Sequence, residues 1–482
     1  MVIMNKRSKF DDRKKIQEGT SLEKLFHLKE HGTNFRTEII AGLTTFFTMA
    51  YIIFLNPTVI GQSNPAFAAT GYEGAMPDSA VFTATCFGAA IGTWLIGWLS
   101  NYPMAQAPGL GLNAVFAYTL CIGFGLSPSA SLAAVFLGGV AFILLTVTGA
   151  RKAIVNSIPR SMKKAISAGI GLFIALIGFA DAGIVIGQKA GAATPVDLAS
   201  FTEPSVILAL VGLILMTILV IQKVPGAIFI GLIIISIIAN ICQFAFGIEM
   251  GVSLPQSWVP NIDFSMFGKC FVGFGELFSA PFASIFAVMI TLLMVDMFDT
   301  IGTLIGAADK AGYLDEHGNL PKIEKAMLAD ALATTIGAVF GTSTVSTYVE
   351  STAGIAAGGR TGLTSTVTGL CFAFALVLSP LLGFVPTAAT APILIIVGIM
   401  MCSSLKDIEW DDLETAFPCF FTVVGMPFFY SITDGIAFGF ISFIIVKVAR
   451  GKFREVKPLM YIISLMFIMM YVITGLQALQ II

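Results

Sequence analysis

Apolar stretches of roughly twenty residues recur along the chain, separated by short polar connections. A helix needs roughly 20 consecutive apolar residues to cross a bilayer. Stretches of about that length lie near 37–56, 80–99, 103–122, 130–150, 165–188, 204–222, 225–247, 279–307, 324–342, 344–359, 362–383, 390–404, 412–430 and 432–449. A last one covers 457–482, either as a fifteenth span or as a helix lying on the membrane surface. The pattern predicts an all-α polytopic membrane protein with about fourteen transmembrane segments.

Positive charge agrees with this segmentation. Outside the N-terminus, Lys and Arg gather in the connections after even-numbered segments, at Arg151, Lys152, Arg160, Lys163, Lys164, Lys223, Lys310, Lys322, Lys325, Arg360, Lys406, Lys447, Arg450, Lys452, Arg454 and Lys457. The opposite connections, 57–79, 189–203, 248–278 and 384–389, hold only Lys189 and Lys269. Because basic loops stay on the cytoplasmic side, we expect a multi-pass protein of the cell membrane with a cytoplasmic N-terminus. Residues 1–36 are polar, lack the apolar core of a signal peptide, and are interpreted as a cytoplasmic extension.

Composition supports the membrane class and excludes other classes. The chain is 56% hydrophobic and 12% charged, whereas soluble domains average about 25% charged residues. A net charge of −2 without a basic stripe argues against a nucleic-acid partner. No two cysteines form a CxxC motif, and the three histidines lie in hydrophilic stretches, which excludes haem ligation and an HExxH zinc site. We therefore expect no metal or cofactor, and proton chemistry within the membrane has to use carboxylates.

Two predicted segments are poor full-length helices. The third, YPMAQAPGLGLNAVFAY, contains Pro103, Pro108, Gly109 and Gly111, and the tenth, GTSTVSTYVESTAGIAAGG, opens with β-branched residues and closes in glycines. Irregular backbone at membrane depth is tolerated only where it lines a cavity inside the protein. Each is the third segment of a set of seven, so the second set would insert with inverted topology. Interrupted segments at matching positions in two halves indicate a transporter binding site.

Several carboxylates fall at the expected membrane depth, where ionisable groups are costly and usually functional. They are Asp181, Glu276, Asp296, Asp299, Asp330, Glu350 and Asp434. Asp296 and Asp299 share one helix face. Two desolvated carboxylates so close would not both ionise easily, so at least one of them should still hold its proton close to neutral pH, as a proton carrier requires. The alternative is a helix end at which both groups are solvated or capped. For Asp330 and Asp434, a position at a helix end is the preferred interpretation.

Glu350 lies where the β-branched stretch gives way to small residues, so a half-helix would begin beside it. The alternative is a simple N-cap carboxylate. Asn113 follows GLGL in the other broken segment and could offer both a donor and an acceptor to a polar ligand. GLGLNA lacks the last glycine of GxGxxG, so a dinucleotide site is dismissed. Arg360 is interpreted as an anchor at the cytoplasmic end.

Four motifs together resemble a known family: FRTEIIAGLTTFFTMAYIIFLNP, APGLGLNAVFAY, VDMFDTIGTLIGAADKAG and STYVESTAGIAAGGRTGLTS. In this order, between about residues 35 and 460, they are similar to the AzgA-like branch of the nucleobase:cation symporters, which comprises guanine/hypoxanthine permeases and related adenine permeases. The resemblance implies two inverted seven-segment repeats, 37–247 and 279–449, divided into core and gate domains. Short strands and half-helices in the third and tenth segments would meet at the substrate. It further implies proton symport by elevator-like movement, in many members as a homodimer.

The resemblance also implies site residues. The substrate-binding residues would be Glu350, Asp296, Asn113, Gly109 and Gly111. The proton-coupling residues would be Asp299 and Asp296. Guanine presents two adjacent N–H donors that one ionised carboxylate can accept together, whereas adenine presents an acceptor at N1, so Glu350 would favour 6-oxopurines.

Other functions are weighed against purine transport. An adenine permease of the same family stays open, and so does sodium in place of the proton, because Thr300 and Thr303 offer hydroxyl groups beside the carboxylates. An anion transporter of similar architecture would need a cation or bare helix N-termini in the site, and Glu350 argues against it. A membrane-embedded enzyme would need a nucleophile with its base, or metal ligands, and no histidine lies in the spans. A scaffold without transport would leave the two broken segments unexplained.

Overall fold

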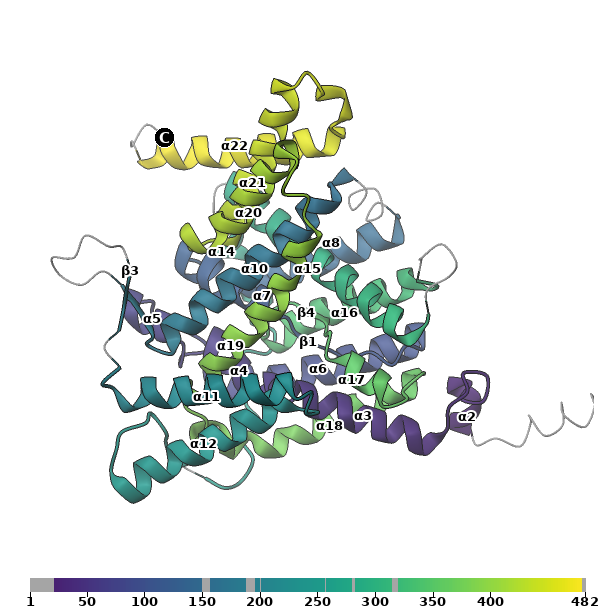
Figure 1. Ribbon diagram of the computed structural model, residues 1–482, viewed down its shortest axis with the longest axis vertical. Coiled ribbons are helices and arrows are strands. Elements are labelled where there is room, and N and C mark those ends of the chain that lie inside the picture. The colour runs from purple at the N-terminus through teal and green to yellow at the C-terminus, as the bar shows by residue number, and fades with distance from the viewer. Residues whose placement is uncertain are drawn as a thin grey trace, which may run out of the picture.

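The computed structural model describes residues 21–149, 157–187, 196–199, 201–255, 257–279, 282–313 and 320–478. Figure 1 shows a mostly helical chain. In the described part, ten helices are long and apolar enough to cross a membrane. Three shorter apolar helices cover Leu110–Gly123, Leu413–Phe428 and Pro458–Ile473. The helical polytopic class is confirmed, while the number fourteen stays a prediction. Residues 1–20 of the expected N-terminal extension, Arg151, Lys152 and Lys189 lie outside the described residues.

The first half of the chain has helices at each of the seven stretches expected there. Its elements are α2 (Ser21–Phe26), α3 (Phe35–Met49), α4 (Ile52–Ile60), α5 (Pro65–Thr70), α6 (Asp78–Ser100), β1 (Gln106–Pro108), α7 (Leu110–Ala114), π-helix η2 (Val115–Gly123), α8 (Pro128–Val147), α10 (Arg160–Asp181), β2 (Val185–Gly187), β3 (Val196–Leu198), α11 (Pro204–Ile221) and α12 (Ala227–Phe246). The first segment consists of two helices, separated at Ala50 and Tyr51. The expected loop 57–79 contains α5, and β2 pairs with β3, a hairpin that the hydropathy pattern did not predict.

The second half differs from expectation mainly in its connections. Its elements are α13 (Lys269–Val272), α14 (Phe274–Ser279), α15 (Phe282–Ala311), α16 (Ile323–Phe340), β4 (Val345–Thr347), α17 (Ser351–Ala356), α18 (Gly362–Phe374), 3-10 helix η3 (Ala375–Phe384), α19 (Thr387–Cys402), η4 (Ser403–Asp407), α20 (Leu413–Phe428), α21 (Ile432–Ala449), η5 (Phe453–Glu455) and α22 (Pro458–Ala478). The connection 248–278 was expected to be a loop, but it contains the short helices α13 and α14. The last apolar stretch forms α22, which packs against α15 and α21.

Polar residues set the start of several helices by satisfying free backbone N–H groups. The side chain of Asn34 accepts from the backbone N–H of Thr37 at 3.0 Å at the start of α3. Ser127 caps α8 in the same way, and Pro128 occupies the first turn, where its missing N–H costs nothing. These caps explain why the apolar runs begin as helices at these positions.

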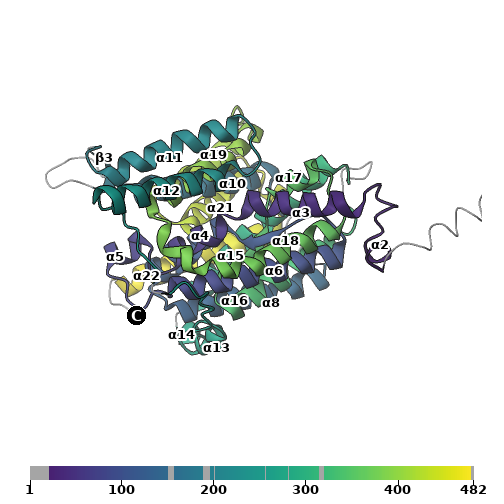
Figure 2. The same ribbon diagram turned by 90° about the horizontal axis from the view of Figure 1, so that it is seen from below.

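The helices pack in two groups, and Figure 2 shows α11, α12 and α19 along one side of the molecule and α6, α8 and α16 along the other. The α6 group comprises α3, α4, α6, α7, η2, α8, α15, α16, α17 and α18 with both strands β1 and β4. The α10 group comprises α10, α11, α12, α19, α20 and α21. Close approach within the α10 group depends on glycine, because a Cβ at Gly171 would lie 2.8 Å from the backbone oxygen of Gly398 on α19. Such small-residue contacts are the usual means of helix packing in membranes.

Candidate functional site

The two broken segments meet in a buried two-stranded sheet. Strands β1 and β4 pair antiparallel, with Gln106 opposite Thr347 and Pro108 opposite Val345. The backbone N–H of Gly109 donates to the oxygen of Thr344 at 3.0 Å and continues the pairing beyond the strand. The short strands expected in the third and tenth segments are therefore confirmed, and so is their meeting inside the protein.

A helix begins directly after each strand. Helix α7 starts after Gly109 and runs on into the π-helix η2, and α17 starts after Glu350. π-Helical turns are rare and occur often at functional sites. Because β1 and β4 are paired, both helix starts lie next to the same sheet. This arrangement brings the glycines of the third segment and the carboxylate of the tenth to one place.

A cavity of about 90 Å³ lies at this place. From the α6 group it is lined by Tyr51, Gly109, Leu110, Gly111, Val295, Asp299, Thr303, Thr347, Tyr348, Val349 and Glu350. From the α10 group it is lined by Ile170, Val397 and Met401. The cavity therefore lies between the two helix groups. Four of the predicted substrate-binding and proton-coupling residues line it together: Glu350, Asp299, Gly109 and Gly111.

Two carboxylates face this cavity, one from helix α15 and one from the residue directly before α17. Oε1 of Glu350 accepts a hydrogen bond of 2.6 Å from the phenol of Tyr51, which lies between α3 and α4. Oδ2 of Asp299 on α15 accepts from the hydroxyl of Ser346 on β4 at 3.2 Å. Each bond holds one carboxylate oxygen in place, and a carboxylate has acceptor capacity for further donors from a ligand. The tyrosine was missed in the sequence because nothing distinguishes it from other aromatic residues in an apolar run.

Asp296 and Asn113 lie away from the cavity wall. Asp296 is 1% exposed, and its carboxylate meets the hydroxyl of Thr300 at 3.5 Å. Asn113 is fully buried, and its Oδ1 accepts from the hydroxyl of Ser343, in the turn before β4. The structure thus brings Asp299 to the cavity together with Glu350. Asp296 and Asn113 are buried and do not line the cavity.

Asp330 has a different position from the one expected. The prediction of a helix-end position is wrong, because Asp330 lies inside α16 and is fully buried. Its carboxylate accepts from the hydroxyl of Thr300 at 2.9 Å and from the side-chain amide of Gln106 at 3.2 Å. The same amide donates to the hydroxyl of Thr347, which lines the cavity. A buried carboxylate therefore connects to the cavity wall through one side chain.

Asp434 agrees with its predicted position at a helix end. It lies in the first turn of α21, where its backbone N–H donates to the hydroxyl of Ser431. Its carboxylate accepts from the phenol of Tyr471 on α22 at 2.6 Å. This carboxylate thus has a structural role between two helices.

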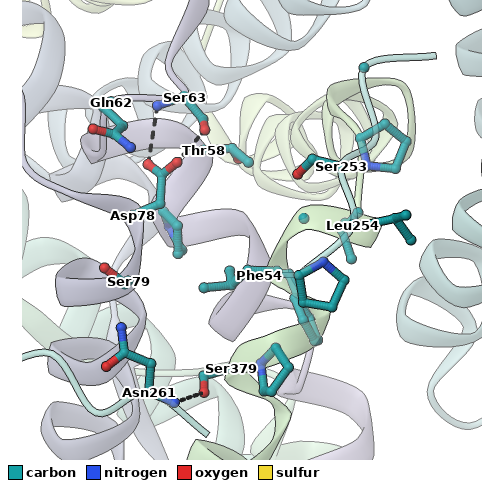
Figure 3. A pocket seen from close by; sticks show the side chains of 18 of the residues that line it. Phe54, Thr58, Gln62, Ser63, Asp78, Ser79, Ser253, Leu254, Asn261 and Ser379 are labelled. Atoms are coloured by element: carbon teal, nitrogen blue, oxygen red, sulfur yellow. Dashed lines mark hydrogen bonds between the residues drawn. The ribbon is translucent and has the colours of Figure 1, made fainter. Parts of the chain in front are cut away.

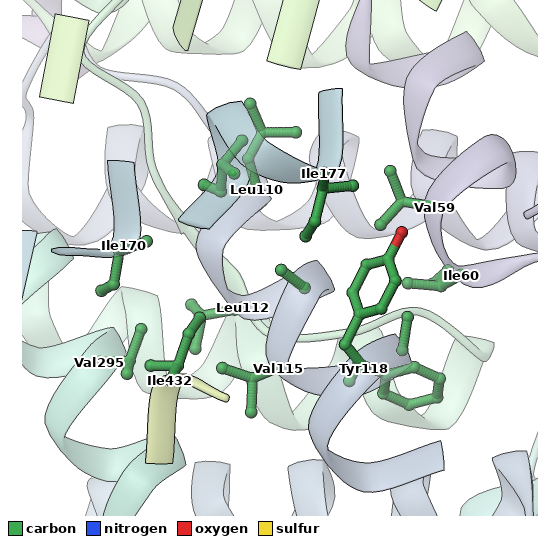
Figure 4. Close-up of a cluster of buried hydrophobic side chains, with 14 of the residues drawn as sticks. Val59, Ile60, Leu110, Leu112, Val115, Tyr118, Ile170, Ile177, Val295 and Ile432 are labelled. Carbon is green, nitrogen blue, oxygen red and sulfur yellow. The ribbon is translucent and has the colours of Figure 1, made fainter. Parts of the chain in front are cut away.

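An apolar layer continues from the cavity along α10. Leu110, Ile170 and Val295 line the cavity and belong to a buried cluster that extends to Ile177 and Tyr118, as Figure 4 shows. Val349, on another part of the cavity wall, is 44% exposed. The cavity is therefore closed by packed side chains toward Ile177, whereas its wall reaches the protein surface at Val349.

Helix α17 is held from the side of α3. The carboxylate of Glu38 is fully buried and accepts from the backbone N–H of Arg360 at 2.8 Å and from the hydroxyl of Thr364 at 2.6 Å. The guanidinium of Arg360 donates to the backbone oxygen of Ile355 at 2.7 Å and so caps the end of α17. The anchoring role expected for Arg360 is consistent with this contact. These bonds fix the half-helix that begins at Glu350.

The close contact of α17 with α3 predicts the effect of Gly354→Ala. A Cβ at Gly354 would overlap Oγ1 of Thr45 and lie 2.7 Å from the backbone oxygen of Ala41. We expect a loss of about 1–3 kcal/mol in stability, as in other overpacked interiors, together with weaker ligand binding because α17 has to move. Thermal unfolding and ligand binding of the purified protein measure both effects. Gly138→Ala on α8 is the control, since nothing lies within 4 Å of that Cβ; equal stability of the two variants would contradict the prediction.

Comparison with known sequences places the site in context. The sequence pattern of the Permease family matches residues 36–438. A putative permease of Methanocaldococcus jannaschii is 42% identical, covering 94% of this chain and 98% of that protein. The guanine/hypoxanthine permease PbuO of Bacillus subtilis is 41% identical, covering 92% and 98%. The adenine permease AdeP of Escherichia coli is 39% identical, covering 93% and 95%.

Solved structures of low sequence identity share the fold. The transmembrane domain of the cyanobacterial bicarbonate transporter BicA is similar with a TM-score of 0.59 at 16% identity, covering 86% of this chain and 97% of that one. The murine anion transporter Slc26a9, in its inward-facing state, is similar with a TM-score of 0.56 at 15% identity, covering 92% and 75%. At such identities the likeness concerns the fold alone.

Proposed function

Since the chain belongs to the nucleobase:cation symporter family of permeases, we propose that it imports the 6-oxopurine bases guanine and hypoxanthine by proton symport. The observation that carries this proposal is the pair of carboxylates, Glu350 and Asp299, facing one cavity between two groups of helices. One carboxylate would recognise the base, and the other would carry the proton. An adenine permease of the same family is the alternative.

Glu350 determines the proposed substrate class. With one oxygen held by Tyr51 at 2.6 Å, its carboxylate still has acceptor capacity for the N1–H and 2-amino groups of guanine. Hypoxanthine offers N1–H alone, and adenine offers an unprotonated N1 that would face a carboxylate without a proton between them. The names of the relatives do not decide this point, because guanine/hypoxanthine and adenine permeases are about equally similar, at 41% and 39% identity.

Among the other predicted site residues, the two glycines would act directly at the cavity, and Asn113 and Asp296 would act indirectly. Gly109 and Gly111 lie in the cavity wall, and a side chain at either position would narrow it. Asn113 would act indirectly, by holding the turn before β4 through Ser343. Asp296 lies one helical turn from Asp299 and would support proton transfer without lining the cavity. Direct contact of Asp296 with the base is the weaker proposal, because Asp296 is not part of the cavity wall.

Transport would proceed by movement of the α6 group against the α10 group, as core and gate. The cavity lies between them, with the carboxylates on the first and Ile170, Val397 and Met401 on the second. Under the proposed topology, the packed layer near Ile177 faces outward and the exposed Val349 faces the cytoplasm. The fold is shared with anion transporters, but two carboxylates in the cavity would repel an anion.

Uptake of radiolabelled hypoxanthine tests the proposal, in cells that lack their own purine permeases. We expect uptake that a protonophore abolishes, that excess guanine blocks, and that uracil leaves unchanged. Replacement of sodium by another monovalent cation should have no effect. Block by adenine alone would move the assignment to the adenine permeases, and sodium-dependent uptake resistant to the protonophore would exclude proton symport.

A further inference from the structure

A second, larger cavity lies apart from Glu350, on the face formed by the connections that carry few basic residues. It has a volume of about 740 Å³ and is lined by residues of α4 and the turn after it, the start of α6, described residues of the connection between 251 and 261, the end of η3 and the residues that follow it. Figure 3 shows Asp78 and Ser63 on one wall and Ser253 with Leu254 on another. The connection that contains Ser253 and Asn261 is hydrogen-bonded to η3. The backbone N–H of Ser253 donates to the backbone oxygen of Gly383 at 2.7 Å, and the backbone N–H of Asn261 donates to the hydroxyl of Ser379 at 3.0 Å. The cavity is thus part of the folded structure.

An apolar groove of about 530 Å³ adjoins this cavity. It lies between α12 and η3, and its rim consists of exposed side chains of α12, among them Ile237 and Ile241, at 54% and 50%. Phe54 and Val385 line both spaces. In a membrane-spanning chain, exposed apolar side chains of this kind face the acyl chains of the bilayer. A partly polar cavity and an apolar groove that have these two residues in common suit a molecule with a polar head and an apolar tail.

We propose that the cavity and the groove together hold one phospholipid with a primary-amine headgroup, of the phosphatidylethanolamine type. The acyl chain would lie in the groove and the headgroup in the cavity. This proposal does not depend on the identity of the transported base.

Charge selects the headgroup. Asp78 is the single ionisable side chain among the described residues that line the cavity. Its two oxygens accept from the backbone N–H and the hydroxyl of Ser63, and a carboxylate has capacity for further donors. An ammonium group would supply such donors, whereas a choline group has no N–H. An anionic headgroup such as phosphatidylglycerol would place a net negative charge beside Asp78 without a cation in the lining to offset it.

The site lies where the two helix groups meet. The side-chain amide of Asn240 on α12 donates to the backbone oxygen of Phe384 at 2.8 Å, and both residues line the groove. α12 belongs to the α10 group, whereas η3 continues α18 of the α6 group. A lipid chain in the groove would therefore contact both groups and bias their relative movement.

Lipid retention by the purified protein tests the proposal. Native mass spectrometry after addition of equal amounts of phosphatidylethanolamine, phosphatidylcholine and phosphatidylglycerol should give the highest occupancy for the first, by up to about fivefold, the range of a partly exposed ion pair. Asp78→Asn should remove this preference. Ile237→Trp should fill the groove and reduce retention of all three lipids, whereas Ile234→Trp, on the same helix but outside the groove, should not.

Two results would overturn the proposal. Equal occupancy by the three headgroups in the unchanged protein would exclude recognition by Asp78. Equal lipid retention by the Ile237→Trp and Ile234→Trp variants would exclude the groove. Because binding is measured without transport, either result leaves the proposed purine symport untouched, and a failure of hypoxanthine uptake would leave this site untouched.

Discussion

Glu350→Gln is expected to reduce uptake of guanine at low concentration by at least about 100-fold, and uptake of hypoxanthine, which offers a single N–H, by at least about 10-fold. The amide nitrogen cannot accept the purine N–H groups, and a charge-assisted hydrogen bond contributes about 1.5–3 kcal/mol, so loss of the pair with guanine amounts to roughly 3 kcal/mol or more. The same amide nitrogen would donate to N1 of adenine. Competition by adenine should therefore become stronger in the variant, as measured by inhibition of the residual uptake.

Tyr51→Phe is the matched control for this prediction. It removes the 2.6 Å hydrogen bond to Glu350 but keeps the carboxylate and the size of the ring. We expect weaker uptake with an unchanged order of guanine, hypoxanthine and adenine, because the acceptor for the base remains. Uptake by Glu350→Gln with the unchanged preference for guanine would refute recognition by a carboxylate fork, whatever its rate.

The local pattern predicted the unusual part of the fold. Pro108, the glycines near it and the β-branched run before Glu350 disfavour an unbroken helix across the membrane, and the bilayer tolerates irregular backbone only inside the protein. Strands β1 and β4 and the helices that follow them lie within the two stretches that these signals marked as irregular, while the strands themselves were expected from the resemblance to the family. The pairing of Gln106 with Thr347 was not predictable, because it depends on contacts between segments half the chain apart.

The site residues were predictable where a single stretch of sequence shows an ionisable side chain among apolar ones. Glu350 and Asp299 stand out as carboxylates in apolar surroundings, and both line the cavity. Asp330 was misjudged because its burial depends on Thr300 and Gln106, which come from other segments and supply its hydrogen bonds. The break between α3 and α4 and the short helices α13 and α14 were also missed. Hydropathy indicates which residues lie in the membrane, but it does not indicate where a helix is interrupted or which conformation a connection has.

Two carboxylates in one cavity have a consequence for coupling. The base would occupy Glu350, so the proton has to reside on another group that senses the same cavity. Asp299 meets this condition, because it lines the cavity and bonds to Ser346 on the strand that precedes Glu350. Asp330 is connected to the same wall through Gln106 and Thr347 but has no direct access to the cavity. Recognition by Glu350 and proton coupling by Asp299 would thus be performed by two different carboxylates, with strand β4 in contact with the second and leading to the first.

Asp299→Asn is expected to abolish accumulation of purine while leaving exchange of purine across the membrane. The asparagine oxygen can still accept from Ser346, so the local structure should persist, but the residue can no longer carry a proton. One proton moving through a potential of 100 mV supplies about 2.3 kcal/mol, which corresponds to a roughly 50-fold gradient of substrate. In proteoliposomes with an imposed potential, the unchanged protein should approach that ratio and the variant should stay near 1.

Ser346→Ala separates the role of the carboxylate from that of its partner. This control removes the 3.2 Å hydrogen bond and keeps Asp299, so accumulation should continue, with at most a shift in its dependence on pH. Accumulation by Asp299→Asn above the equilibrium ratio would remove this residue from the proton path. In that case the buried carboxylates Asp296 and Asp330, which both contact Thr300, would be the next candidates, and their amide variants would be measured in the same vesicles.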